Sequence, residues 1–280
     1  MWSRRCSPSQ AFGPERFVPP PVPLEDISLD VVLLSHTHYD HLDYGTAMRL
    51  GNSVLWIVPL GVKALLESSF SITNVVELDW WDTYSLTSSK TGKELKVIFL
   101  PAKHWTSRSP FDRNTCLWGG FAVISDANRF YFAGDTAYCD VFQTIGKHLG
   151  PFDIAAIPVG AYKPRWFMKA SHCDPAEAVQ IHKDVRAKAS CAVHWGTFPL
   201  ADEDFVEPAL ELARARLDKA AACGGDVNFF TAAHGETFDV SAGAPIRGSS
   251  DFATLFPELF EHYRKVYDDK LLKHQLAFNS

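Results

Sequence analysis

The sequence lacks several features that mark particular classes of protein. Its six cysteines are scattered, with no close-spaced pair and no repeated interval, which argues against a disulfide framework and against a thiolate zinc site. No apolar run approaches the roughly 20 residues that a membrane-spanning helix needs, and the N-terminus lacks the apolar core of a signal peptide. We therefore expect an intracellular protein, cytoplasmic or peripherally associated with a membrane.

Clustered positive charge is also absent. The chain carries 27 lysines and arginines against 33 aspartates and glutamates, a net charge of -6. Proteins that bind nucleic acid usually need a basic face to neutralise phosphates, so we set a nucleic-acid partner aside. The chain has 280 residues, 46% of them apolar, which is enough for a full hydrophobic core.

Short apolar runs bounded by turn residues predict a series of strands. The first is Asp30–Ser35, which follows a proline-rich stretch. Further strands are expected at Val54–Val58, Lys96–Leu100, Gly120–Ile124, Phe130–Ala133, Ile154–Ile157 and Ala192–His194, and helices at Gly61–Ser68, Pro175–Arg186 and Pro208–Ala222. Strands mixed with helices in this order indicate an α/β protein with layered sheets.

A change of composition near Asp239 divides the chain into two parts. We expect residues 1–238 to form the domain. Residues 239–280 read as a linker that contains glycine and serine, followed by a helical tail at Phe252–Leu272. The linker permits packing of this tail on the domain but does not require it.

Four potential metal ligands lie within six residues, directly after the first predicted strand. They are His36, His38, Asp40 and His41. A loop that leaves a strand can aim alternate side chains into one space, and zinc accepts both imidazole and carboxylate ligands. Iron and manganese use the same ligands, so the residues alone leave the metal open.

Three more potential ligands each follow a later predicted strand. They are His104, Asp135 and His194. Strand ends on one side of a pair of layered sheets converge on a common cleft, so we expect these residues to join the first four. Asp43 is a candidate to orient a ligand histidine through its second ring nitrogen.

The first four ligands match the HxHxDH signature of the metallo-β-lactamase superfamily, which the chain resembles. The resemblance implies an αββα sandwich, a mixed α/β fold, with two Zn²⁺ ions per chain. One zinc ion would bind His36, His38 and His104, the other would bind Asp40, His41 and His194, and Asp135 would bridge the two.

Longer strings, which span most of the chain, resemble the N-acylphosphatidylethanolamine-hydrolysing phospholipase D family and its bacterial relatives. They include Ser35–Tyr44, Gly134–Thr136, Ile157–Lys169 and His194–Phe198. The resemblance implies a phosphodiesterase that releases N-acylethanolamine and phosphatidic acid, and we expect a hydroxide held between the two zinc ions to attack phosphorus. A phospholipid substrate implies peripheral contact with a membrane. A homodimer is one possible state of the chain, and the resemblance leaves this question open.

The resemblance also assigns roles to residues beside the metals. Tyr39 and His172 would contact the substrate, and Asp40 would act in the catalytic centre as a metal ligand. We expect His172 to orient the phosphate or to protonate the leaving alkoxide. His172 also precedes a helix that begins with proline, where it could equally be a capping residue.

The chain departs from the family in two places. The match to the family begins at Trp2, and in family members several strands precede this position. We therefore expect a sandwich that lacks its N-terminal strands. Thr37 replaces the asparagine common between the first two histidines. Two alternative functions stay open, a related hydrolase of a small phosphorylated ester or lactone and a catalytically silent truncated scaffold.

The remaining histidines and the tryptophans are expected to be structural. His182 lies in a helical context, and His234 reads as a turn residue or as one that supports a ligand. Tryptophans such as Trp166 and Trp195 are expected in the core, with an acyl-chain groove as the alternative.

Overall fold

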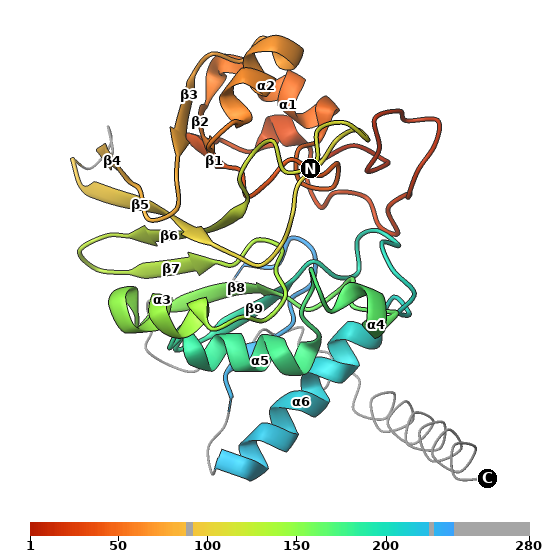
Figure 1. Ribbon diagram of the computed structural model, residues 1–280, viewed down its shortest axis with the longest axis vertical. Coiled ribbons are helices and arrows are strands. Elements are labelled where there is room, and N and C mark those ends of the chain that lie inside the picture. The colour runs from red at the N-terminus through yellow and green to blue at the C-terminus, as the bar shows by residue number, and fades with distance from the viewer. Residues whose placement is uncertain (88–91, 224–226, 238–280) are drawn as a thin grey trace.

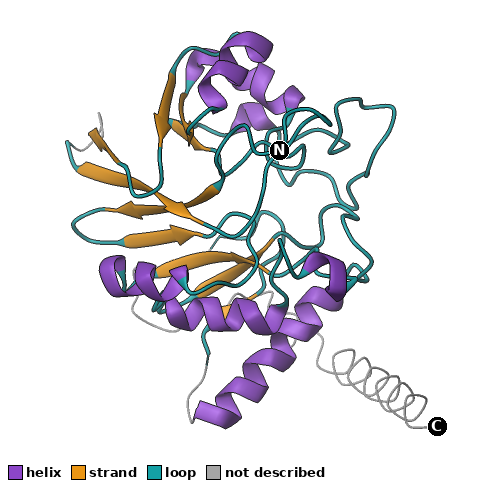
Figure 2. Ribbon diagram, in the orientation of Figure 1, coloured by secondary structure: helices purple, strands orange, loops and turns teal. Residues whose placement is uncertain are grey.

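The computed structural model describes residues 1–87, 92–223 and 227–237 of the chain. The predicted linker and tail lie outside the described residues, so the domain boundary stays a prediction. Figures 1 and 2 show two sheets that face each other, with helices on the outer side of each. Within the described ranges, no helix is both long and apolar enough to cross a membrane.

The smaller sheet is parallel, with its strands in the order β1, β2, β3. These strands span Val31–Leu33, Leu55–Pro59 and Val75–Leu78. Helix α1 (Tyr44–Leu50) connects the first two strands, and α2 (Val62–Phe70) connects the second and third. Parallel neighbours need such crossovers, which carry the two helices onto one face of the sheet.

The larger sheet has the order β10-β9-β8-β7-β6-β5-β4. Strands β4 to β7 are antiparallel, whereas β8, β9 and β10 continue parallel to β7. Their bounds are Thr83–Thr87, Glu94–Pro101, Gly119–Ile124, Arg129–Phe132, Ile154–Pro158, Ser190–Val193 and Phe229–Phe230. The connecting helices are α3 (Val141–Leu149), α4 (Arg165–Met168), α5 (Pro175–Asp184) and α6 (Glu207–Cys223).

Three apolar clusters fill the three spaces between the layers. Phe99 and Phe121 pack with Ile57 between the two sheets. Leu66 of α2 packs with residues of the smaller sheet, and Phe142 of α3 packs with residues of the larger one. This four-layer arrangement of helix, sheet, sheet and helix confirms the predicted αββα sandwich.

Among the described residues, each predicted strand and helix is present, with ends that differ by a few residues, and the predicted helix at Phe252–Leu272 lies outside them. His194 lies outside β9 because its φ of 62° ends the extended conformation. The expected core position of Trp166 is wrong, because 84% of its surface is exposed on α4.

Candidate metal centre

The seven predicted ligands all follow the carboxyl ends of strands. The HxHxDH segment leaves β1 in the smaller sheet, while the other three ligands follow β5, β7 and β9 in the larger sheet. The amide of Gly119 at the start of β6 donates to the carbonyl of Ser35, so a backbone hydrogen bond connects the segment to the larger sheet. The two sheets therefore bring residues distant in sequence to one place.

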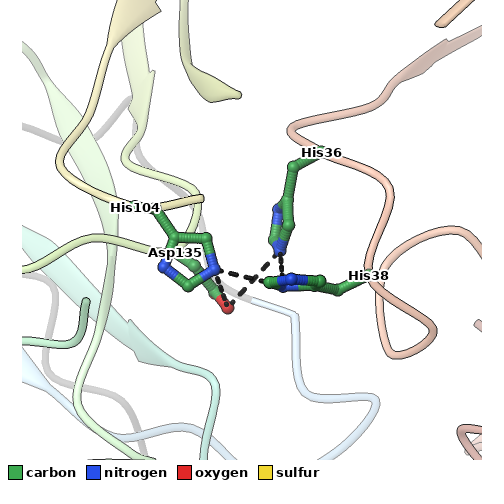
Figure 3. Close-up of side chains that lie close together, drawn as sticks. All are labelled: His36, His38, His104 and Asp135. Carbon is green, nitrogen blue, oxygen red and sulfur yellow. Dashed lines mark hydrogen bonds and ion pairs between the residues drawn. The ribbon is translucent and has the colours of Figure 1, made fainter. Parts of the chain in front are cut away.

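One group of donor atoms comes from three histidines and one aspartate, shown in Figure 3. Nδ1 of His38 lies 2.9 Å from Nε2 of His36 and 3.2 Å from Nε2 of His104. Oδ2 of Asp135 lies 3.7 Å from each of those two Nε2 atoms. The four donor atoms lie within 4.8 Å of one another, which suits ligands around one ion.

The second group shares Asp135 with the first. Nε2 of His194 lies 3.2 Å from Oδ2 of Asp40 and 3.2 Å from Oδ2 of Asp135. Nε2 of His41 lies 3.2 Å from an oxygen of each carboxylate, without the alignment of a hydrogen bond to either. Asp135 therefore takes part in both groups.

The hydrogen bonds around the first group fit a bound cation. Nδ1 of His104 lies 2.9 Å from the carbonyl oxygen of Ser171, so this nitrogen carries the hydrogen and Nε2 presents a lone pair. The Nε2 atoms of His36 and His104 both face Nδ1 of His38, and one hydrogen there cannot bond to both. A metal ion bound there would remove this conflict, because it would accept three imidazole lone pairs at once.

Burial keeps the first group's imidazoles neutral. It lowers the pKa of His38 to about 4 and holds the pKa of His36 well below its usual value. The pKa of His104 is also lowered by burial. Neutral rings are the form that binds metal, so these histidines are held ready as ligands without the loss of a proton.

In the second group, the charges of neighbouring side chains outweigh burial in setting the pKa values. Burial alone would lower the pKa of His41, but the carboxylates of Asp135 and Asp40 outweigh it and raise that pKa to about 9. The same carboxylates raise the pKa of His194. Burial raises the pKa of Asp40 and Asp135, but the neighbouring histidines outweigh it and hold both values well below the usual range. Both carboxyl groups are therefore ionised, as ligands must be.

His172 lies beside both groups. Its ring centroid is 4.9 Å from that of His104 and 5.6 Å from that of His194, and its Nδ1 is buried without a hydrogen-bond partner. Asp174, not His172, is the N-cap of α5. The capping alternative is therefore wrong.

Tyr39 is held by one residue of the β5–β6 connection, Arg108. Its hydroxyl donates to the carbonyl oxygen of Arg108 over 2.7 Å, and the Arg108 guanidinium lies 4.1 Å from its ring centroid. Nη1 of Arg108 also donates to the carbonyls of Thr37 and Leu42, both over 2.8 Å. Arg108 thus holds the HxHxDH segment near both of its ends, at Thr37 and Leu42. No local pattern in the sequence predicts this role.

Thr37 and Asp43, which lie near the candidate ligands in the chain, both make local hydrogen bonds. Thr37 donates its backbone amide to the hydroxyl of Thr106, and the two hydroxyl groups also share a hydrogen bond, so the threonine is accommodated. Asp43 caps α1 by accepting from the amide of Thr46. The hydroxyl of Ser35, rather than Asp43, contacts ligand rings, at 3.1 Å from Nδ1 of His36 and 3.3 Å from Nδ1 of His41.

A cavity of about 600 Å³ opens on the second group. Asp40, His41 and His194 form part of its wall. The rest is largely apolar and includes Trp2, Ile27, Phe132, Trp195 and Phe198, with Arg16 and His234 among its polar members. The site thus combines a charged cluster with an apolar chamber of the size that ligand pockets usually have.

Known proteins match the chain over most of its length. A family described as "Beta-lactamase superfamily domain" matches residues 6–195. N-acyl-phosphatidylethanolamine-hydrolyzing phospholipase D 1 of Caenorhabditis elegans is 44% identical, over 86% of this chain and 69% of that protein. The mitochondrial protein of the same name from Saccharomyces cerevisiae is 37% identical, over 77% of this chain and 46% of its own.

The fold has solved counterparts. A metallo hydrolase from the archaeon Ignicoccus hospitalis superposes with a TM-score of 0.55 at 22% identity, covering 77% of this chain and 81% of its own. At that identity, the likeness speaks for the fold alone.

Proposed function

Because the chain belongs to the β-lactamase superfamily and, within it, to the N-acylphosphatidylethanolamine-hydrolysing phospholipase D family, we propose that it hydrolyses N-acylphosphatidylethanolamine as a zinc-dependent phosphodiesterase. The products are N-acylethanolamine and phosphatidic acid. The chain spans 69% of the nematode relative's length and 46% of the yeast relative's.

One observation carries the proposal, namely the two donor groups that share Asp135. A single structural zinc site needs four protein ligands, whereas seven donors around a shared carboxylate suit a pair of ions. Two bound zinc ions would supply an activated water nucleophile and offset the negative charge of the phosphate. His36, His38 and His104 would hold one ion and Asp40, His41 and His194 the other.

The protein's own residues then position the substrate. Burial lowers the pKa of His172 to about 3, so its ring is neutral near pH 7 and has one N–H to donate to a phosphate oxygen. Nδ1 of His172 is buried without a hydrogen-bond partner among the described residues, which supports either proposed role, orienting the phosphate or protonating the leaving alkoxide. Tyr39 stays a proposed substrate contact.

The apolar cavity supports a lipid over a small soluble ester. A phosphorylated sugar or lactone offers few apolar atoms to the side chains of Trp195 and Phe198, whereas an acyl chain covers them and releases their water. We therefore propose a phospholipid substrate and peripheral contact with the membrane that contains it.

The direct test is hydrolysis of N-acylphosphatidylethanolamine in detergent by the zinc-loaded chain, with both products identified by mass spectrometry. We expect His104→Ala to lower the rate at least about a hundredfold, because it removes a proposed ligand. His148→Ala is the matched control, since His148 is exposed on α3.

Two results would contradict the proposal. One is a chain that hydrolyses only soluble phosphorylated esters or lactones, which would point to the related hydrolase. The other is a folded, metal-free chain that stays inactive after zinc is added, which would favour the silent scaffold.

A further inference from the structure

We propose that helix α4 docks on a phospholipid bilayer through the side chains of Trp166 and Phe167. The proposal rests on the proposed function, because a lipid substrate gives the protein a reason to meet a bilayer. It goes further by naming the surface and by linking that surface to the metal centre.

The two aromatic side chains are exposed side by side. Trp166 is 84% exposed and Phe167 is 65% exposed, with ring centroids 5.7 Å apart. Large apolar side chains exposed singly are common, but an adjacent pair marks a contact surface. Tryptophan also favours the boundary between lipid and water, where its ring is apolar and its N–H is hydrated.

The charge beside the pair fits a phospholipid. Lys169 follows the helix and is exposed. A lysine next to an aromatic pair is the composition of a membrane-interface anchor, in which the cation meets lipid phosphate while the rings enter the headgroup region. A protein partner would not require that cation, and the bilayer is where the proposed substrate resides.

Ion pairs hold α4 so that the pair faces outward. The Arg165 guanidinium lies 3.2 Å from Oδ2 of Asp174 and also pairs with Glu177, both at the start of α5. Arg165 Nη1 donates to the carbonyl oxygen of His172 over 2.7 Å. These three contacts hold Arg165 in place. Because α4 is short, they also hold Trp166 and Phe167 in their exposed positions.

The same short segment reaches the metal centre. The amide of His172 donates to the carbonyl oxygen of Met168 over 2.9 Å, and the carbonyl of Ser171 accepts from His104. The docking helix and two residues that contact the metal centre thus form one continuous piece of chain. A bilayer bound at α4 would therefore meet a segment that is hydrogen-bonded to the candidate ligand His104.

A further exposed aromatic side chain lies in the N-terminal segment. Helix α4 projects at the right-hand side of Figure 1, as does the red loop that follows the N-terminus. That loop contains Phe12, which is 76% exposed.

The test is cosedimentation with vesicles of phosphatidylcholine and phosphatidylglycerol. We expect the double variant Trp166→Ser and Phe167→Ser to bind these vesicles at least about tenfold more weakly than the wild type, because the apolar area of both rings stays in water. Leu217→Ser is the matched control, because Leu217 is 55% exposed on α6. Metal content and thermal unfolding of the double variant verify that it is folded.

Equal vesicle binding by the double variant and the wild type would overturn the docking proposal, as would a wild type that does not bind vesicles. Vesicle binding is measured without N-acylphosphatidylethanolamine, so it tests the docking surface alone. Hydrolysis tests the proposed function alone. A wild type that needs the aromatic pair for vesicle binding but does not hydrolyse N-acylphosphatidylethanolamine would support the docking surface and contradict the proposed function.

Discussion

At the scale of the residue, the sequence marks the candidate ligands of the site but not the residues that support them. The HxHxDH segment is local, and each remaining ligand follows an apolar strand, so all seven could be picked out in advance. Arg108 and Thr106 could not, because both hydrogen bond to the segment around Thr37 from about seventy positions away. Their roles depend on how two loops meet, which no local pattern encodes.

Arg108 gives a prediction about metal affinity. Arg108→Met keeps the aliphatic stem but leaves the carbonyls of Thr37 and Leu42 without their donor, which loosens the ligand segment. We expect zinc affinity to fall roughly 10- to 100-fold, as it does when groups that orient ligands are removed. Competition with a chromophoric chelator measures it. Arg113→Met, an exposed position in the same loop, should match the wild type; equal affinity in Arg108→Met would contradict the assigned role.

His182 gives a prediction about pH. Burial, with Lys183 and Arg216, lowers its pKa to about 4, and its Nδ1 lies 2.7 Å from the hydroxyl of Ser190. As pH falls from about 6.5 to about 4, the unfolded chain binds a proton that the folded chain does not, so stability is lost across this window. The loss approaches about 3 kcal/mol.

The corresponding measurement is the free energy of unfolding in urea at about pH 7 and about pH 5. His182→Gln has no titrating ring, so it should lose less stability than the wild type over this interval. Parallel losses in the two proteins would show that the buried imidazole does not control the pH dependence.

At the scale of the element, the central strands were predictable and several edge elements were not. Strand β5 contains the continuous apolar run Val97–Leu100, whose side chains are buried. Strand β4 reads Thr-Tyr-Ser-Leu-Thr, alternates between exposed and half-buried positions, and pairs only with β5 among the described strands. The alternation fits a half-buried strand, but the run is only five residues long and the local sequence does not show which strand it pairs with.

Helix α5 allows a test with an internal control. Asp174 accepts from the amide of Glu177, whose side chain accepts in turn from the amide of Asp174, which makes a capping box. Asp140, the N-cap of α3, makes no side-chain capping bond. We expect Asp174→Ala to lower the free energy of unfolding by about 1–2 kcal/mol and Asp140→Ala to change it little. Chemical denaturation compares them, and similar losses would argue against the capping box.

At the scale of the whole molecule, the candidate metal centre joins the two sheets. The smaller sheet supplies the HxHxDH segment, and the larger sheet supplies His104, Asp135 and His194. The predicted four-layer sandwich is what places these strand ends together, which is why a correct fold expectation also located the site. Ions bound there would stabilise the folded state, because their ligands come from both layers only when the chain is folded.

The measurement that tests this account most directly is zinc content per chain by elemental analysis of the wild type, His38→Ala and Asp135→Ala. We predict about two zinc ions in the wild type, about one in His38→Ala, which keeps the second donor group, and close to none in Asp135→Ala, which loses the shared bridge. A folded wild type without zinc, or an Asp135→Ala chain with the zinc content of the wild type, would contradict a two-ion centre built around Asp135.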